Sequence, residues 1–479
     1  MEVIQTTKGK PKLFLDGDLY TKSKTSPNGH KFYWICVRRA YGCRGSLTTT
    51  SEYQDPRRGV EHNHFPNNLS LEMAKARLTM KNRARQGEKS CKVYKYKEVC
   101  APASEDLQDF LPSASVCART MRKARSETHP TEVKKLADLT FEGDWLTTGG
   151  TNPEQFLQAD NGRHSEERIV LFATRGQLEL LSSATEWFVD GNFGMSPELF
   201  MQLYIIRVPL GETAVTALYI LLERKTQATY EEMLDMLLDR LGELQLGHSV
   251  QRVVLDFELA MINALRIKLG NALSFGACFF HLTQSTYRKI GNLGLTILYK
   301  EDDEFALFAS KIDALALLPV ADVKRGMAHL KSICDERGEG LLKYFDETYV
   351  NGKARRNGRC LAPQFPPELW NQHSATIHGE ARTNNLAEGW NSMFKTMIGH
   401  KHPTVWNLIK NLRLDAAEVT KSVRQAELGD PPRARKQKAI RAALHRRQKN
   451  LCEDYLCGRL PLPQFLTQIA KNLRNKDLN

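Results

Sequence analysis

Two acidic residues stand where apolar segments of the chain end. Asp190 follows the apolar residues 187–189, and Asp256 follows residues 253–255. Taken singly, each acid has an ordinary explanation, Asp190 in an Asp-Gly turn after a strand and Asp256 as a turn or helix-capping residue. Two carboxylates held close together, however, repel one another unless a cation binds between them. Mg²⁺ is the natural candidate, because it prefers hard oxygen ligands.

The apolar pattern around these acids predicts the elements that position them. From residue 186 onward the segments follow the order three strands, helix, strand, helix, strand. This order fits a ribonuclease-H-like mixed α/β sheet, in which the first and fourth strands lie adjacent and parallel. Asp190 and Asp256 end those two strands and would therefore lie side by side. Together they favour a metal site over two unrelated turn residues.

Glu388, in the stretch "TNNLAEGWN", is the candidate for a third acid in a two-metal site. The spacing of Asn385 and Glu388 also matches a helix capping box, which is a purely structural alternative. On the predicted helix, Glu388 shares the polar face with Asn391 and Lys395, opposite an apolar stripe. That face could meet solvent or an active site, so periodicity leaves both alternatives open.

Near the N-terminus, two cysteines and two histidines have the spacing of a zinc site. Cys36 and Cys43 are followed by the pair His62 and His64. Two thiolates and two imidazoles can complete the tetrahedral shell of a zinc ion. The segment is too short for a large apolar core, so a metal ion would explain how it folds. The alternative is a small β-domain whose cysteines are incidental.

Basic and aromatic residues surround these four side chains, a mixture that suits contact with nucleic acid. We expect Arg38, Arg39 and Arg44 to bind DNA. The stretch "LFLDGDLYTKSKTSPNGHKFYWIC", followed by "GC" and "HNH", resembles a FLYWCH-type zinc finger. The resemblance covers about residues 8–66 and includes all four predicted ligands. It implies zinc binding, with contact to DNA or protein as the task of the module.

The net charge of +13 is unevenly distributed along the 479 residues. Residues 1–130 hold 24 Lys and Arg against 13 Asp and Glu, and residues 421–479 hold 14 against 5. The middle, 131–420, is acidic, with 30 against 37. Basic ends suggest a polyanionic partner, usually nucleic acid, and an acidic centre could hold metal ions. Solvated surface charge is the alternative.

Composition indicates a soluble globular protein of several domains, with 41% hydrophobic and 26% charged residues. No apolar run approaches the roughly 18 residues that a membrane span needs. The first ten residues lack the apolar stretch of a signal peptide. We therefore expect an intracellular protein whose ten cysteines are thiols or metal ligands.

The sequence pattern of residues 67–165 predicts a basic helical segment. The stretch "SLEMAKARLTMKNRARQ" has the pattern of a basic amphipathic helix, and "SEDLQDFLPSASVCARTMRKARSE" suggests two helices broken near Pro112. Arg119, Arg122 and Lys123 on the last of these helices are candidate DNA contacts. A helix-turn-helix is one interpretation. A helical linker with a solvated basic face is the alternative.

Four motifs in the acidic middle together resemble the transposase domain of Mutator-like elements (MULE). They are "FVDGNFG", "LDFELA", "CFFH" and "TNNLAEGWN", in this order, and the resemblance covers about residues 166–420. It implies that Asp190, Asp256 and Glu388 form an acidic triad that binds catalytic Mg²⁺ or Mn²⁺. Cys278 and His281 of "CFFH" form a pattern shared with hAT-like transposases, and for these two residues we favour a structural role.

The resemblances also divide the chain. In order, the expected parts are the zinc finger at 1–66, the basic helical segment at 67–165, the first part of the catalytic core at 166–290, an all-helical insertion at 291–375, the last core helix with the third acid at 376–420, and a basic helical tail at 421–479. Arg433 and Arg435 in the tail could contact DNA or form a nuclear-localisation signal. Trp370, in the insertion, could stack on a displaced base or pack in the insertion core.

The preferred function is a DDE-type DNA transposase in the nucleus. It would cut double-stranded DNA at transposon terminal inverted repeats and join it to target DNA, and a homodimer or larger assembly would bring two ends together. A domesticated DNA-binding regulator without catalysis and a stand-alone nuclease are the alternatives. Intact acids at all three positions favour the catalytic interpretation, because a protein that only binds DNA has no need for them.

Overall fold

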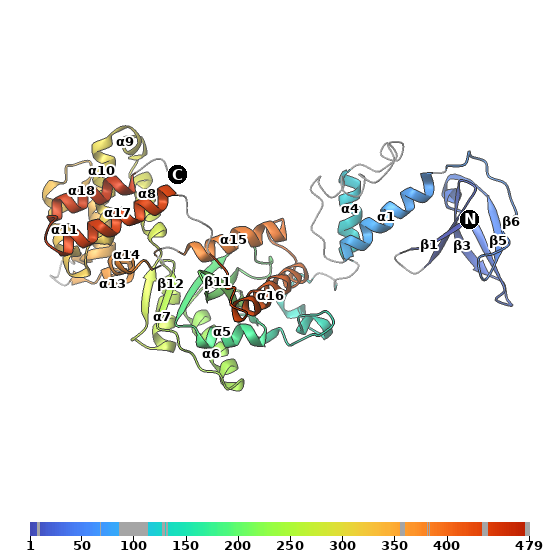
Figure 1. Ribbon diagram of the computed structural model, residues 1–479, viewed down its shortest axis with the longest axis horizontal. Helices are drawn as coiled ribbons and strands as arrows, with labels where there is room; N and C mark the ends of the chain where they lie inside the picture. The colour runs from blue at the N-terminus through green and yellow to red at the C-terminus, as the bar shows by residue number, and fades with distance from the viewer. Residues whose placement is uncertain are drawn as a thin grey trace. The chain divides into compact units, whose positions relative to one another are not determined.

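A computed structural model describes most of the chain: residues 1–6, 10–67, 69–85, 114–126, 130, 133–354, 360–380, 382, 384–433 and 439–474. The chain forms two compact units, Met1–Glu132 and Val133–Asn479, and each has a sheet of its own (Figure 1). Among the described residues, no helix combines the length and the apolar character that crossing a membrane requires.

The first unit is built on an antiparallel sheet of six strands that pair in chain order. The strands are β1 (Glu2–Gln5), β2 (Pro11–Leu15), β3 (Asp18–Thr25), β4 (Lys31–Cys36), β5 (Ser46–Thr50) and β6 (Arg57–Arg58). The buried apolar cluster of this sheet is small and consists of Leu13, Tyr20, Trp34 and Leu47. So small a core stabilises a sheet only weakly, which leaves room for a stabilising metal ion.

Two helices follow this sheet. α1 (Leu69–Arg85) matches the predicted basic helix, and α4 (Ala114–Ser126) corresponds to the second of the two helices expected around Pro112. The first of those two helices lies outside the described residues. α1 and α4 pack against each other, and each contributes a buried methionine, Met80 and Met121.

The second unit contains a seven-stranded mixed sheet with the order β13-β12-β9-β10-β11-β8-β7. The strands are β7 (Leu157–Asp160), β8 (Ile169–Phe172), β9 (Glu186–Asn192), β10 (Gln202–Leu210), β11 (Thr213–Leu222), β12 (Arg252–Leu255) and β13 (Ser274–Ala277). Pairing from β9 through β10, β11 and β8 to β7 is antiparallel, whereas β12 is parallel to β9 and β13 is parallel to β12. The predicted adjacency of β9 and β12 is confirmed.

Helices cover both faces of this sheet (Figure 1). In β10, Leu203 and Ile205 belong to one buried cluster, and Tyr204 and Ile206 belong to another. The first cluster also contains residues of α15 (Asn385–Ile398) and α16 (Val405–Glu427), and the second contains residues of α5 (Arg175–Ser183), α6 (Gln227–Glu243) and α7 (Leu259–Leu269). Burial on both faces accounts for the unbroken apolar runs in these strands.

A group of helices lies between β13 and α15 in the sequence and is completed by the C-terminal helices. It begins with α8 (Phe279–Asn292), α9 (Thr296–Glu301), α10 (Asp303–Ala314), α11 (Val320–Ile333), α12 (Glu339–Phe345), α13 (Pro367–Trp370) and α14 (His373–His378). α17 (Ala439–Leu456) packs against α14, and α18 (Leu462–Leu473) packs against α10. The segment expected as a basic tail therefore contributes buried residues, such as Phe465 and Ile469, to the core of the second unit.

Candidate functional site

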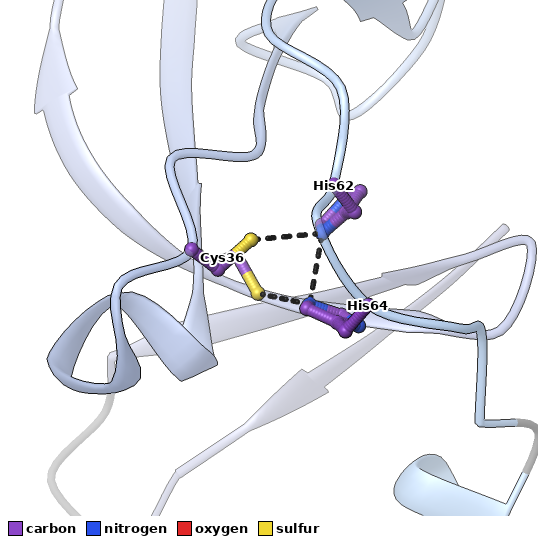
Figure 2. Close-up of side chains that lie close together, drawn as sticks. Cys36, His62 and His64 are labelled. Atoms are coloured by element: carbon purple, nitrogen blue, oxygen red, sulfur yellow. Dashed lines mark hydrogen bonds between the residues drawn. The ribbon is translucent and has the colours of Figure 1, made fainter.

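The four predicted zinc ligands of the first unit converge on one point. Sγ of Cys36 lies 3.3 Å from Nε2 of His64, Sγ of Cys43 lies 3.4 Å from Nδ1 of His62, and these two imidazole nitrogens are 3.1 Å apart. Figure 2 shows Cys36, His62 and His64 pointing toward one another. Usual zinc bond lengths in a tetrahedron place the ligand atoms roughly 3.3–3.8 Å apart. The cluster therefore needs only a slight expansion to hold a zinc ion.

Local backbone structure holds the two sulfur atoms. Cys36 ends β4, and its Sγ accepts a hydrogen bond of 3.3 Å from the backbone N–H of Arg38. Sγ of Cys43 accepts one of 3.3 Å from the N–H of Gly45. A Cβ at Gly45 would lie 2.5 Å from the imidazole of His62, so the close approach of this loop to the ligand requires glycine.

The two thiols differ in how easily they lose a proton. Burial raises the pKa of Cys36 to about 11. Burial acts in the same direction on Cys43, but hydrogen bonds from backbone N–H groups, including that of Gly45, outweigh it and lower the pKa of this thiol. Because zinc binds thiolates, its binding must displace the proton of Cys36 at neutral pH.

Asp18 and Tyr20 of β3 lie behind the two histidines. The hydroxyl of Tyr20 is 2.7 Å from Nε2 of His62, and the Asp18 carboxylate is 3.4 Å from the same nitrogen and 3.7 Å from Nδ1 of His64. Each histidine thus turns one ring nitrogen to the ligand cluster and the other toward oxygen. Oxygen partners of this kind fix the tautomer and orientation of metal-binding histidines. Sequence analysis missed this pair, because its role depends on which face of β3 meets the cluster.

We expect Asp18→Asn to weaken zinc binding about 10- to 100-fold, because the variant loses the negative charge that orients both imidazoles. Competition with a chromogenic zinc chelator measures this effect. Asp16→Asn is the matched control, because Asp16 is exposed and its carboxylate pairs with Arg58 on the surface. Equal zinc affinity of Asp18→Asn and the wild type would show that the carboxylate does not support the histidines.

Five of the predicted DNA-contacting residues of the first unit are exposed. Arg38, Arg39 and Arg44 are exposed around the cluster, and Arg119 and Lys123 are exposed on α4. Two aromatic side chains near the ligands are also exposed, Tyr41 by 87% and Phe65 by 92%. In the second unit, Arg433 is exposed beside Asp430. Arg435 and the side chain of Arg122 lie outside the described residues.

In the second unit, Asp190 and Asp256 stand at the same level of adjacent strands. β12 pairs in parallel with β9, Val254 lies opposite Phe188, and each acid follows this pair by two residues. Burial, and then the charge of Asp256, raise the pKa of Asp190 to about 7. The structure therefore brings the two acids together, as the strand order predicted.

The structure excludes the Asp-Gly turn at Asp190 and the helix cap at Asp256, whereas Asp256 does lie in the turn that follows β12, where its carbonyl oxygen accepts a hydrogen bond of 2.7 Å from the N–H of Glu258. β9 continues through Asn192, and Asp190 pairs with Ile205 of β10, so the Asp-Gly turn considered for Asp190 is wrong. Gly191 instead allows close packing, since a Cβ there would lie 2.5 Å from Oε1 of Gln202. Asp256 does not cap α7, because the N-cap position is occupied by Glu258.

Glu388 lies in the first turn of α15, which packs against β9. The helix begins after Asn384, and Asn384 forms no side-chain capping bond, so the capping-box explanation of Glu388 is wrong. Nδ2 of Asn384 donates instead to the carbonyl oxygen of Val189, next to Asp190, at 2.9 Å. Burial raises the pKa of Glu388, while His281 lowers it and Asp256 raises it. Glu388 therefore lies within electrostatic range of both residues.

Buried polar contacts anchor α15 on either side of Glu388. Arg207 of β10 donates a hydrogen bond to the carbonyl oxygen of Leu386, and Nε1 of Trp390 donates to Oδ2 of Asp415 at 2.9 Å. Arg207 and Asp415 are both buried. Because buried charged groups are costly to leave unpaired, these contacts resist a shift of the helix that carries Glu388.

Asn391, one helical turn after Glu388, donates from Nδ2 to Oδ2 of Asp190. Two buried polar atoms of α15 have no hydrogen-bond partner among the described residues, Oε1 of Glu388 and Oδ1 of Asn391, whereas Oδ1 of Asp256 and Nδ1 of His281 contact each other at 2.8 Å. Buried polar atoms are rarely left without a partner in folded proteins. Two such atoms on the helix that contacts Asp190 indicate a place for a bound ion or water.

Cys278 and His281 of "CFFH" occupy different positions. Cys278 is fully buried, and its Sγ accepts a hydrogen bond of 3.3 Å from the N–H of Asn384, which links the start of α8 to the start of α15. Nδ1 of His281 lies 2.8 Å from Oδ1 of Asp256 without hydrogen-bond alignment, and this contact raises the pKa of His281 to about 10. Ligand atoms of Asp256, Cys278 and His281 lie within 4.8 Å of one another, which is close enough to share a metal ion.

A groove of about 410 Å³ opens at Asp190 and Asp256. Its lining includes polar, cationic and aromatic side chains that sequence analysis did not identify: Phe193, Gln202, Tyr204, Lys225, Glu258 and Arg288. They come from separate strands, loops and helices, so no local motif marks them. Asn391, which contacts Asp190 from α15, is easier to find, because its spacing from Glu388 places both on one helical face.

The prediction that Trp370 stacks on a displaced base is wrong. Trp370 is fully buried, and its Nε1 donates to the carbonyl oxygens of Tyr349 and Phe365 at 3.1 and 3.0 Å. Its ring packs edge-on against that of Phe345, with centroids 5.6 Å apart. A tryptophan with these contacts cannot reach DNA unless the surrounding helices unfold, so Trp370 packs in the insertion core.

Comparison with known proteins identifies the sheet of the first unit, which carries the ligand cluster. The FLYWCH zinc finger domain matches residues 3–64, a range that contains all four converging side chains. The chain therefore carries a FLYWCH zinc finger domain at its N-terminus, and its ligand cluster indicates Zn²⁺. No curated protein matches the chain.

Proposed function

We propose that the second unit is a metal-dependent DNA transposase whose acids Asp190, Asp256 and Glu388 bind Mg²⁺ or Mn²⁺. The observation that carries this proposal is the pairing of Asp190 and Asp256 at one groove, beside α15, whose Glu388 interacts electrostatically with Asp256. The structure excludes the Asp-Gly turn at Asp190, the helix cap at Asp256 and the capping box at Glu388, and it keeps Asp256 in the turn between β12 and α7. The three acids therefore need a shared partner, and a divalent cation supplies it.

The residues at this site fit such a cation. A carboxylate oxygen of Glu388 and the amide oxygen of Asn391 are buried without a hydrogen-bond partner among the described residues. Hard oxygen atoms are the preferred ligands of Mg²⁺. A cation would also relieve the repulsion that raises the pKa of Asp190. Sulfur and imidazole at Cys278 and His281 suit softer metals than Mg²⁺.

The strand order supports the same proposal. β11, β10, β9, β12 and β13 follow one another across the sheet, and the last two run parallel to β9. This is the arrangement expected of a ribonuclease-H-like sheet. Helices inserted between β13 and α15 precede the third acid, as the resemblance to MULE transposases implies.

The side chains of the groove have distinct tasks in the proposed reaction. Divalent metal ions bound by such acids activate water or a DNA 3′-hydroxyl and stabilise the leaving oxygen. Asn391 orients the carboxylate of Asp190 through its amide N–H. His281 holds Asp256 on the other side through its imidazole. Lys225 and Arg288 bring positive charge to the groove, which suits a phosphate backbone.

DNA binding in this proposal is shared between the units. The zinc finger presents Arg38, Arg39 and Arg44, and α4 presents Arg119 and Lys123. These exposed cations would hold double-stranded transposon ends, and a homodimer or larger assembly in the nucleus would pair two ends. A regulator that binds DNA without cutting it is the second candidate, since the family match covers the finger alone.

Incubation of the full chain with DNA and a divalent metal separates these candidates. The substrate is a supercoiled plasmid that carries the genomic sequences flanking the coding region. We expect nicked, cut and joined products with Mg²⁺ or Mn²⁺ and no products with Ca²⁺, which fits the acids but favours a looser geometry. If the protein binds the plasmid but does not cleave it with any of these metal ions, the chain is the DNA-binding regulator.

A further inference from the structure

Phe193 is an exposed aromatic residue beside the acids. It follows Asp190 by three residues, is 48% exposed and lines the same groove. The turn that carries it is fixed, because Oδ1 of Asn192 accepts a hydrogen bond of 3.0 Å from the N–H of Met195, and the carbonyl oxygen of Phe193 accepts one of 3.3 Å from Ser196. The ring is therefore held in the groove and is not part of a loose loop.

Two cations accompany this ring. Nζ of Lys225 lies 5.1 Å from the centroid of Phe193, and Arg288 of α8 also lines the groove. Neither forms an ion pair within the described parts of the chain, although Arg288 donates a hydrogen bond of 2.6 Å to Oε1 of Gln284. An aromatic ring with a cation over one face and a second cation in the same groove matches a nucleotide, which joins a planar base to a phosphate.

The size of the groove indicates whether a DNA duplex or a single nucleotide can bind in it. Its volume is about 410 Å³, and sites of roughly 300–1,000 Å³ enclose single small molecules. The major groove of a DNA duplex alone is about 12 Å wide, so a duplex cannot enter as a whole. One nucleotide that has left the base stack can enter, and enzymes that need access to a base or its neighbours use this solution.

We propose that this groove binds one unpaired nucleotide next to the phosphate to be cut. Its base stacks on the exposed face of Phe193, and Lys225 and Arg288 contact its phosphates. The inference rests on the proposed function for the position of the cut. The nucleotide site itself depends only on the ring, the two cations and the shape of the groove.

Photocrosslinking of the full chain, loaded with zinc, tests the site without catalysis. The probe is a single-stranded DNA oligonucleotide that contains 5-iodouracil, a base that crosslinks to stacked aromatic side chains, and no magnesium is added. We expect a crosslinked peptide that contains Phe193, and at least a fivefold lower yield of it with Lys225→Gln. Ile267→Ala is the control, because it removes an exposed apolar side chain of the same unit outside the groove. Crosslinks confined to the zinc finger would overturn the proposal.

Cleavage supplies the second measurement. Loss of the stacking between one base and an aromatic ring corresponds to roughly a 5- to 150-fold change in rate. We therefore expect Phe193→Ala to slow cutting of a fully paired substrate by this factor. A mismatch at the cut should restore much of the rate, because the nucleotide no longer has to leave a base pair. Equal cutting of both substrates by wild type and Phe193→Ala would refute the nucleotide site alone. A Phe193 crosslink in a protein that cuts no DNA would refute the transposase and leave the nucleotide site standing.

Discussion

Replacement of Asp190 or Asp256 by asparagine, or of Glu388 by glutamine, is expected to abolish DNA cleavage and strand transfer while the protein stays folded and still binds DNA. Each amide keeps the shape of the acid and removes the negative charge that holds the cations. The metal ions act on the attacking and leaving oxygens together. We therefore expect the rate of DNA cleavage to fall roughly a thousandfold or more in each single variant. A double variant should cleave no more slowly than a single one, as for side chains that act as one unit.

The fold should survive these substitutions. Burial and the charge of Asp256 raise the pKa of Asp190 to about 7, so an asparagine resembles the protonated acid that the metal-free protein holds near neutral pH. Its side-chain oxygen can still accept the hydrogen bond from Asn391. Thermal unfolding monitored by circular dichroism checks that the variants are intact.

Glu186→Gln is the matched control for this series. Glu186 begins the same strand as Asp190, but its carboxylate pairs with Arg252 at 2.6 Å, at the opposite end of β9 from Asp190. Cleavage by this variant should remain close to that of the wild type. If Asp190→Asn or Asp256→Asn also cut normally, the proposed mechanism would be excluded. Normal cutting by Glu388→Gln alone would mean that the third ligand is another residue.

The adjacency of the two aspartates could be predicted because strand order follows from sequence order. Two apolar runs, each followed by an acid and separated by a hairpin and a helix, leave few ways to form a sheet. The same logic failed at the end of β9. Asp190 and Gly191 have the composition of a turn, but their backbone pairs with β10, and that pairing depends on the distant Gln202 and Tyr204.

The position of Glu388 could not be predicted from spacing. A polar helical face points to solvent or to a site, and only tertiary contacts decide between them. In this protein the decisive contacts come from Arg207 and Asp415, which anchor α15 from β10 and α16. For Trp370 the sequence suggested a DNA contact where the structure has a buried residue. A single tryptophan in a polar stretch gives no sign of burial, because the residues that surround it, Phe345, Tyr349 and Phe365, are distant in the sequence or lie in other elements.

The zinc ligands were predictable because all four lie in one short segment with too little apolar core of its own. Four buried apolar side chains form that core, Leu13, Tyr20, Trp34 and Leu47. Two thiols and two imidazoles at this spacing are typical of a structural zinc site. The supporting residues Asp18 and Tyr20 carry no such signature, since an acid and a tyrosine on a strand are common.

Loss of one zinc ligand is expected to unfold the first unit and to leave the second unit folded. Zinc binding by zinc-finger peptides is worth roughly 10–16 kcal/mol at neutral pH, far more than the stability of a typical small domain. In Cys43→Ser the sheet β1–β6 would have to fold on its small core alone. Its melting transition should disappear, with Trp34 becoming solvent-exposed, whereas the larger core of the second unit should keep its own transition.

Metal analysis and two-step unfolding measure this result together. The wild type should contain about one zinc per chain, and Cys43→Ser should contain almost none. Cys457→Ser is the matched control, because Cys457 is an exposed thiol of the second unit and should affect neither zinc content nor unfolding. Affinity for DNA should fall with the zinc, since the unfolded finger no longer presents Arg38, Arg39 and Arg44 on one scaffold. A first unit that stays folded without metal would show that the sheet is stable on its apolar core, and that the four side chains converge for another reason.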